Sequence, residues 1–266
     1  MRFKVDHDYH IHSRLSRCSR CDEQTPERIL QVSKDSGLSR ICITDHYWDV
    51  KIEGMSKWYE TQDFDHLALS LPLPQDPDVE FLFGCETDID KYMRLGMPRE
   101  RFDDFDFVIV PTTHLHMKGF TIFEEDIPNM KRRAELWVER FDALLNMDLP
   151  FEKIGVAHLA CSLLNSSGSR EDFLNTFKLI PSDDMKRLFD KAAKLGCGIE
   201  LNYDDMLYSD SEAETILRPF HIAKDCGCKF YIGGDGHRTT DNIDYTKYER
   251  TIDLLGLTED DKFILK

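Results

Sequence analysis

The chain has 266 residues, of which 34 are Lys or Arg and 50 are Asp or Glu, so its formal charge is −16 at pH 7 with neutral histidines. With 41% hydrophobic and 11% aromatic residues it has material for a large core, which excludes intrinsic disorder, and its length suits one α/β barrel-sized domain. The acidic balance argues against extended contact with nucleic acid or anionic membranes, both of which select clustered Lys and Arg. A small-molecule partner is therefore expected.

Seven short apolar runs recur at intervals too long for hairpins and predict strands. Most lack strict polar alternation, as strands buried on both faces do, and the segments between them can hold helices. The runs are residues 3–9, 40–44, 80–85, 106–110, 153–157, 198–202 and 229–233. Seven βα units without a break in composition favour a closed or nearly closed barrel over an open sheet.

Helix signals fall between these runs. Thr25 and Pro26 form a cap and a first-turn proline, and apolar residues mark one face of segments 130–145, 183–195 and 212–226. The one long connection, residues 48–78, carries three prolines near its end and predicts an elaborated loop or lid within a single domain of residues 1–266.

The cellular compartment is predicted from the absence of a membrane span and of a secretory signal in the sequence. No segment approaches the ~20 apolar residues of a membrane span, and charges interrupt the N-terminal stretch where a secretory signal is apolar. The eight cysteines are spread along the chain, several inside apolar runs, which favours reduced thiols. We expect a soluble cytoplasmic protein.

Six of the ten histidines and two acidic residues lie at or just past the ends of predicted strands, which in a βα barrel is the rim where active sites are assembled. A His-x-His pair on an extended segment puts two imidazoles on one face, and imidazole with carboxylate is a ligand set for Zn, Mn or Fe. The candidates are His10, His12, His46, Glu86, His114, His158, Asp235 and His237. They are too many for one tetrahedral ion, so two or three divalent ions are expected.

The remaining histidines, His7, His66, His116 and His221, are better interpreted as ordinary structural or exposed residues, although His116 competes with His114. Glu200, at the polar end of the predicted sixth strand, either lines the pocket or has a packing or capping role. The pair Cys226 and Cys228 precedes the last strand, at the end of the barrel opposite the rim, and is interpreted as structural.

The order and spacing of six motifs carry a family resemblance. The motifs are Asp8-Tyr9-His10-Ile11-His12-Ser13, Ile43-Thr44-Asp45-His46, Gly84-Cys85-Glu86, Asp106-Phe107-Val108-Ile109 leading to His114, Ala157-His158, and Gly234-Asp235-Gly236-His237-Arg238. Across nearly the whole chain they resemble the PHP (polymerase and histidinol phosphatase) family of metal-dependent phosphoesterases. The resemblance implies a distorted seven-stranded (β/α)7 TIM-like barrel with a metal cluster at the C-terminal rim of the strands.

The resemblance also implies a ligand assignment. One ion would be held by His10, His12, Glu86 and Asp235. Glu86 would bridge to a second ion held by His114 and His158, and His46 and His237 would serve a third. Asp45 would fix an imidazole tautomer.

Cys18 stands where many family members have a third histidine after the His-x-His pair. The third ion is then thiolate-bound, weakly held or absent, and a thiolate favours zinc or iron over manganese. A plain loop thiol is an equal alternative.

Such a cluster implies hydrolysis of a small phosphomonoester, of the histidinol phosphate type, by metal-activated hydroxide. A metal-bound water, His46 and His237 are the candidate proton donors to the leaving group. Four arginines beside the predicted ligands are candidates for binding substrate phosphate, with Arg17 and Arg238 preferred over Arg14 and Arg20.

Three alternatives stay open: an amidohydrolase-like metal hydrolase, a nuclease or phosphodiesterase, and a non-catalytic metal-binding regulatory protein. The −16 charge disfavours the nuclease. Specificity is expected to come from residues 48–78 and 111–127. The sequence does not indicate an oligomeric state.

Overall fold

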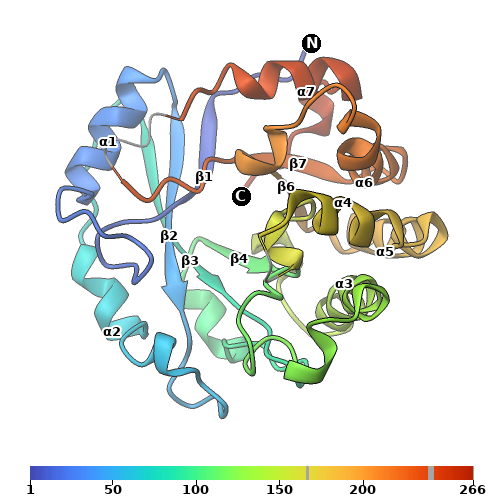
Figure 1. Cartoon of the computed structure of the whole chain (residues 1–266). Coiled ribbons are helices and arrows are strands. Elements are labelled where there is room, and N and C mark those ends of the chain that lie inside the picture. Colours follow the sequence, from blue (N-terminus) through green and yellow to red (C-terminus); the bar gives the residue numbers. More distant parts are fainter. Residues whose placement is uncertain (166–167, 239–242, 266) are drawn as a thin grey trace.

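Seven parallel strands follow one another in chain order around a central space, and helices cover the outside (Figure 1). This computed structural model describes residues 1–165, 168–238 and 243–265. The strands are β1 His7–Ile11, β2 Arg40–Tyr47, β3 Glu80–Thr87, β4 Phe107–Pro111, β5 Ile154–Ala157, β6 Gly198–Asn202 and β7 Lys229–Gly233. Each strand pairs with the next, which confirms the predicted parallel arrangement.

The first and last strands meet just beyond their ends. The backbone N–H of His12 donates to the carbonyl of Gly236 at 3.0 Å, and that of Asp235 donates to the carbonyl of His10 at 2.7 Å. Ile11 and Gly236 form a parallel bridge. The sheet thus closes at its carboxyl end and confirms the prediction of a distorted, nearly closed seven-stranded barrel.

The helices occupy the connections between strands. They are α1 Pro26–Asp35, α2 Phe64–Leu67, α3 Met130–Leu145, α4 Arg170–Lys178, α5 Ser182–Leu195, α6 Ala213–Asp225 and α7 Lys247–Leu255. Short 3-10 turns add Lys57–Tyr59, Ala68–Ser70, Arg99–Asp104, Glu124–Asp126, Phe151–Lys153, Ser162–Leu164, Asp204–Met206 and Glu259–Asp261. The predicted helices appear within one residue of their expected bounds, whereas α2, α4 and α7 were not singled out in the sequence.

The helix α1 begins where its cap predicts. The Thr25 hydroxyl accepts a hydrogen bond from the backbone N–H of Arg28 at 3.3 Å, and Pro26 opens the first turn. None of the helices in the described ranges is both long and apolar enough to cross a membrane.

The first strand differs from its prediction, which placed it at residues 3–9. It begins at His7 and continues to Ile11. Phe3 is buried, but its backbone N–H donates to the carbonyl of Leu257 at 3.2 Å, so this half of the apolar run pairs with the C-terminal segment. Burial alone does not distinguish a strand of the barrel from a segment that packs beneath it.

Aromatic side chains fill the barrel below the rim. Tyr9, Phe107, Tyr231 and Phe263 pack together, with the ring centroids of Phe107 and Tyr231 at 5.2 Å. Gly155 faces this cluster, and a Cβ added to it would lie 2.5 Å from Phe107 Cζ and 2.4 Å from the Tyr231 hydroxyl oxygen. The barrel closes around these rings only because this strand position lacks a side chain.

We therefore expect Gly155→Ala to destabilise the protein by about 1–3 kcal/mol, the usual cost of overpacking a core with rigid neighbours. Chemical denaturation measures the effect. The control is Gly236→Ala, whose added Cβ meets nothing nearer than 3.9 Å. Equal unfolding free energies for the two variants would contradict this description of the barrel floor.

Candidate metal centre

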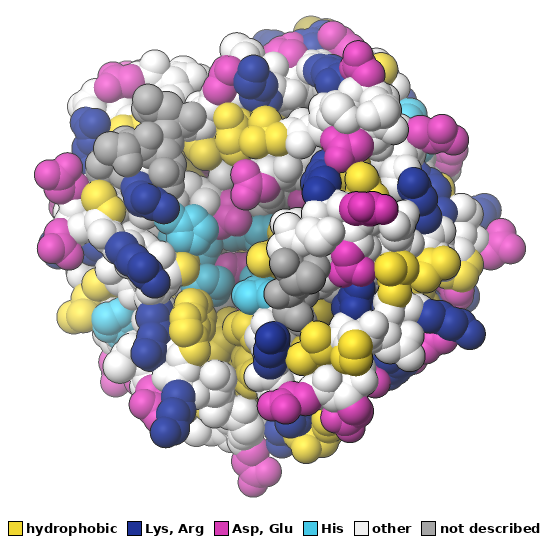
Figure 2. Space-filling model, in the orientation of Figure 1, with side chains coloured by type: hydrophobic (Ala, Val, Ile, Leu, Met, Phe, Trp, Pro, Cys, Tyr) yellow, Lys and Arg dark blue, Asp and Glu magenta, His cyan; other side chains and the backbone are white. Residues whose placement is uncertain are grey.

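A cavity of about 800 Å³ opens at the carboxyl ends of the strands. Figure 2 shows histidine and acidic side chains at the bottom of this hollow and Lys and Arg side chains beside it. Trp58 and Tyr59, from the connection between β2 and β3, and Met117 and Phe120, from the segment after β4, line its wall. Both segments that were expected to set specificity therefore contact the cavity.

Four donor atoms from three strand ends surround one point, and those of His10, His12 and Glu86 are buried. The distances from His10 Nε2 to His12 Nε2, Glu86 Oε2 and Asp235 Oδ1 are 3.2, 3.5 and 3.5 Å. His12 Nε2 lies 3.4 Å from Glu86 Oε2 and 3.2 Å from Asp235 Oδ1. A tetrahedral zinc ion with ligands at about 2.0–2.1 Å separates its ligand atoms by about 3.3 Å. The donor set thus has the dimensions of a divalent ion site.

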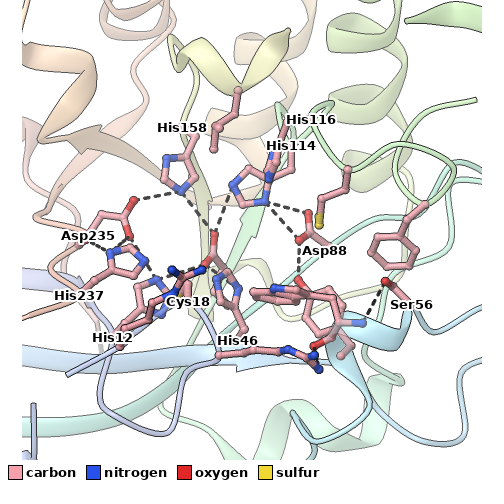
Figure 3. A pocket seen from close by; sticks show the side chains of 18 of the residues that line it. His12, Cys18, His46, Ser56, Asp88, His114, His116, His158, Asp235 and His237 are labelled. Carbon is pink, nitrogen blue, oxygen red and sulfur yellow. Dashed lines mark hydrogen bonds and ion pairs between the residues drawn. The ribbon is translucent and has the colours of Figure 1, made fainter. Parts of the chain in front are cut away.

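A second group of donors lies on the other oxygen of the same carboxylate. His158 Nε2 is 3.4 Å and His114 Nε2 is 3.9 Å from Glu86 Oε1. Asp235 Oδ2 is 3.8 Å from His158 Nε2. Glu86 Oε1 is buried and has no hydrogen-bond partner in the described part of the chain. Glu86 therefore faces two donor groups with its two oxygens. Figure 3 shows His12, His114, His158 and Asp235 around this pocket.

Two of these residues adopt a backbone conformation that side chains disfavour. His158 has φ +59° and Asp235 has φ +54°, both in the left-handed region. The His158 N–H donates to Glu200 Oε2 at 2.9 Å, and the Asp235 N–H is bound to the His10 carbonyl. Such strain persists only where the surroundings enforce it, and it concentrates at functional sites.

Two carboxylates orient the imidazoles from behind. His10 Nδ1 lies 2.6 Å from Glu200 Oε1, and His114 Nδ1 lies 3.2 Å from Asp88, which also accepts the Tyr59 hydroxyl at 2.6 Å. The Nε2 atoms then face the cavity. Asp88 was missed in the sequence, although it follows Glu86 by two residues, the spacing that puts both on one face of a strand. Glu200, for which the sequence left open a role in the pocket or in packing, thus positions a candidate ligand.

The role expected of Asp45 was wrong. It was expected to hold an imidazole, but its two oxygens accept the backbone N–H and the hydroxyl of Ser13, each at 2.6 Å. Side chains alternate along β2, so His46 faces the cavity and Asp45 fastens the loop after β1. Glu200 and Asp88 take the role that was expected of Asp45.

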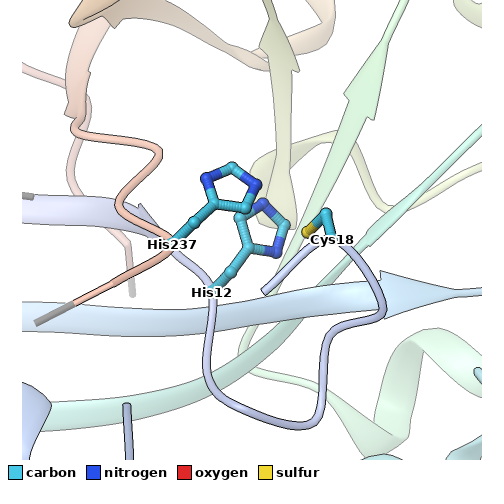
Figure 4. Close-up of side chains that lie close together, drawn as sticks. All are labelled: His12, Cys18 and His237. Atoms are coloured by element: carbon cyan, nitrogen blue, oxygen red, sulfur yellow. The ribbon is translucent and has the colours of Figure 1, made fainter. Parts of the chain in front are cut away.

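Cys18 and His237 lie next to His12. One donor atom of each of the three residues is within 4.8 Å of the others (Figure 4). His46 stacks on His12 with ring centroids 4.7 Å apart, and its Nδ1 lies 3.1 Å from Glu86 Oε2. The structure thus groups His237 with Cys18 and His12, whereas His46 faces Glu86.

The other histidines have structural roles or lie outside the donor groups. His7 accepts the N–H of Ile232 at 3.1 Å, and His66 Nε2 contacts the Leu15 carbonyl at 2.9 Å. His221 is exposed on α6. His116 lines the cavity, but it is not in a donor group with Glu86, so the geometry favours His114 as the candidate ligand.

Three of the four candidate arginines line the cavity: Arg17, Arg20 and Arg238. Arg14 is exposed and does not line it. The guanidinium of Arg17 donates to the carbonyls of Lys57 and Trp58 at 2.9 and 3.1 Å, so it fastens the connection between β2 and β3.

The carboxylates dominate the electrostatics of the imidazoles on β1. Burial by itself lowers the pKa of His10, but the charges of neighbouring carboxylates, led by Glu200, raise it well above its usual range. Burial also opposes protonation of His12, yet Cys18 and the adjacent carboxylates raise its pKa to about 10. Both shifts favour the protonated form of the imidazole when no ion occupies the site.

The pKa values of the two acids and of two further histidines are lowered instead. Burial raises the pKa of Glu86 and Asp235, but the surrounding imidazoles outweigh it and hold both pKa values well below their usual range. At His46 burial prevails and lowers the pKa to about 3, and it also lowers the pKa of His237. The centre therefore presents ionised carboxylates whose charge protons or metal ions can balance.

Comparison with known proteins agrees with this geometry. The model of the PHP domain family matches residues 8–204. The structure is similar to histidinol phosphate phosphatase from Lactococcus lactis subsp. lactis Il1403, solved with zinc, L-histidinol and phosphate, at 20% identity and a TM-score of 0.57, over 95% of this chain and 94% of that one.

A Listeria monocytogenes protein, provisionally assigned as a histidinol phosphatase, is similar at 15% identity and a TM-score of 0.57, over 91% of this chain and 99% of that one. At these identities the likeness shows the fold. No curated protein sequence matches the chain.

Because the pKa values of His10 and His12 are raised, zinc binding at pH 7 is expected to release protons, and zinc affinity should rise with pH until these imidazoles are neutral. Calorimetric titration of the metal-free protein in buffers of different ionisation enthalpy counts the protons. A binding heat that is the same in every buffer would show that the ligands are already neutral and would contradict this electrostatic description.

Proposed function

The chain belongs to the PHP domain family, and on this premise we propose that it is a metal-dependent phosphoesterase that hydrolyses a small phosphomonoester. The observation that carries the proposal is the placement of Glu86 between two groups of buried donors. One carboxylate oxygen faces His10 and His12, and the other faces His114 and His158. A shared carboxylate is the arrangement that holds two ions close together, as two-metal phosphatases require.

The donors define which residues would hold each ion. His10, His12, Glu86 and Asp235 would hold the first. Glu86 would share the second with His114 and His158, where Asp235 Oδ2 is also near. Zinc, manganese and iron all suit imidazole and carboxylate ligands.

Bound ions would supply a hydroxide at neutral pH, neutralise phosphate oxygens and stabilise the leaving oxygen. The protein's own groups hold the ligands in place for this chemistry. Glu200 and Asp88 fix the imidazoles of His10 and His114 so that Nε2 faces the cavity. No nucleophilic side chain is needed.

His46 and His237 suit a ligand role better than a proton-donor role. Burial lowers the pKa of both, so the two imidazoles are neutral near pH 7. Neutral imidazole is the form that binds a metal. We propose that solvent at the centre, rather than either histidine, protonates the leaving group.

The cavity favours a small substrate with one apolar side. A volume of about 800 Å³ is within the usual range for a small-molecule site. Trp58, Met117 and Phe120 would contact the leaving group, and His116 Nδ1 offers a buried polar atom without a hydrogen-bond partner in the described ranges. Because the Lactococcus lactis structure contains L-histidinol and phosphate, a histidinol phosphate-like ester is the first candidate substrate.

The setting is proposed to be the cytoplasm. All eight cysteines lie in the described ranges and are free thiols, which persist in a reducing compartment. The formal charge of −16 supports a small phosphorylated partner rather than extended nucleic acid or a membrane surface.

The direct test is a panel of phosphomonoesters, including histidinol phosphate, assayed with the metal-free protein before and after addition of zinc, manganese or iron(II). We expect turnover only with metal. Glu86→Gln should lose both bound ions and turnover, whereas the exposed His221→Ala control should retain them. A metal-saturated protein without turnover on any ester would refute the proposal.

Arg20 is the arginine best placed to bind substrate phosphate. It lines the cavity and has no hydrogen bond or ion pair within the described residues, whereas Arg17 is bound to loop carbonyls. A hydrogen bond to a charged group contributes about 1.5–3 kcal/mol.

Arg20→Ala should therefore lower kcat/KM roughly 10- to 100-fold, at about 1.4 kcal/mol per tenfold change. The matched control is Arg14→Ala, which removes an arginine of the same loop that does not line the cavity. If both variants kept the wild-type kcat/KM, Arg20 would not bind phosphate.

A further inference from the structure

Helix α3 buries two side chains that carry N–H donors. Arg140 and Trp137 are three residues apart, so they share one face of the helix, and both are 0% exposed. Figure 1 shows α3 outside the strands, where the inward face of a helix is ordinarily apolar. The partners of these two donors explain why polar groups occupy this face.

The guanidinium of Arg140 bonds to backbone carbonyls. Nε donates to the Thr112 carbonyl at 2.9 Å, and the terminal nitrogens donate to those of Ile89 at 2.8 Å and Thr121 at 3.1 Å. A longer bond of 3.4 Å reaches the Asp90 carbonyl. In the described ranges no carboxylate lies within ion-pair distance, and burial lowers the pKa of Arg140 to about 10, so the group is charged at neutral pH. A buried cation is costly unless its donors are satisfied, and here the carbonyls satisfy them.

The carbonyls that Arg140 binds lie beside the second donor group. Ile89 directly follows Asp88, whose carboxylate lies 3.2 Å from His114 Nδ1. Thr112 lies two residues before His114 itself. One planar guanidinium thus joins the segment that carries the imidazole to the segment that carries the carboxylate behind it. Because the fork is rigid, it fixes how these two segments are spaced.

Trp137 holds the other imidazole of the same group. Its indole N–H donates at 3.0 Å to the carbonyl of Leu159, the residue after His158. The Thr113 hydroxyl, next to the carbonyl that Arg140 binds, donates to the His158 carbonyl at 2.7 Å. His158 has a disfavoured φ of +59°, a conformation that persists only where its surroundings enforce it. These two bonds are part of that enforcement.

On the basis of the proposed function, we propose that Arg140 and Trp137 are positioning residues for the second ion, and that they act by placing His114 and His158 from the side away from the cavity. Within the described residues, no hydrogen bond joins α3 to β1 or to Asp235. The first ion, held by His10, His12, Glu86 and Asp235, is therefore independent of these two side chains.

Calorimetric zinc titration of the metal-free protein tests the proposal, with Arg140→Lys as the first variant. Lysine keeps the charge but lacks the planar fork that joins the carbonyls. Loss of a contact behind a metal ligand typically costs about 10- to 100-fold in metal affinity. We expect the second equivalent of zinc to bind more weakly by this factor and the first to bind as in the wild type.

The matched control is Arg133→Lys. Arg133 is a buried arginine two turns earlier on the same helix, but its guanidinium donates to Asp172 of α4 at 2.8 Å and does not contact the strand ends. Both equivalents of zinc should bind to this variant with wild-type affinity.

Trp137→Phe is the second variant, because it removes the indole N–H and keeps an aromatic ring. It should weaken the same equivalent of zinc. In both variants the zinc concentration that gives half-maximal turnover should rise by the factor measured for the second equivalent, while excess zinc restores kcat. A purely structural role would not produce this selective and zinc-reversible loss.

Wild-type affinity for the second equivalent in Arg140→Lys or in Trp137→Phe would overturn the inference for that residue. Loss of both equivalents, or failure of the variant to fold, would also overturn it, because the residue would then support the whole barrel rather than one ion position. Neither result decides the phosphoesterase proposal, which fails if the metal-saturated wild type hydrolyses no ester.

Discussion

The structure depends on one buried carboxylate. Glu86 is 1% exposed, and its two oxygens lie within 3.1–3.9 Å of imidazole nitrogens that come from the ends of β1, β2 and β5 and the segment after β4. An isolated charge at this depth would be strongly unfavourable, so the imidazoles and the carboxylate stabilise one another. A parallel barrel makes this arrangement possible, because every strand delivers its carboxyl end to the same rim.

The surrounding fold holds this cluster in place rather than merely enclosing it. Glu200 receives both the His10 imidazole and the His158 N–H, and a Cβ at Gly233 would lie 2.0 Å from its oxygen. Asp235 keeps a left-handed backbone through its bond to the His10 carbonyl. The contacts that close the barrel therefore also place the candidate ligands. Bound ions are expected to stabilise the fold as well as to supply the chemistry.

The sequence predicted the strand order and the donor-bearing strand ends, because buried parallel strands leave a distinct apolar pattern and polar residues at their ends stand out against it. It did not predict the positioning contacts. Asp45 and Asp88 each lie close in sequence to a candidate ligand, but only the packing of neighbouring strands determines which carboxylate meets an imidazole. Phe3 shows the same limit, since hydropathy records its burial and not its partner. The roles of Arg14 and Arg20 likewise depend on the path of one loop.

The proposed function depends on two ions joined by Glu86 at the rim of the barrel. Anomalous diffraction from crystals of the zinc-loaded protein tests it most directly. We predict two peaks flanking the Glu86 carboxylate, one bounded by His10, His12 and Asp235 and the other by His114 and His158. A single peak without Glu86 as a ligand, or peaks away from these residues, would contradict it.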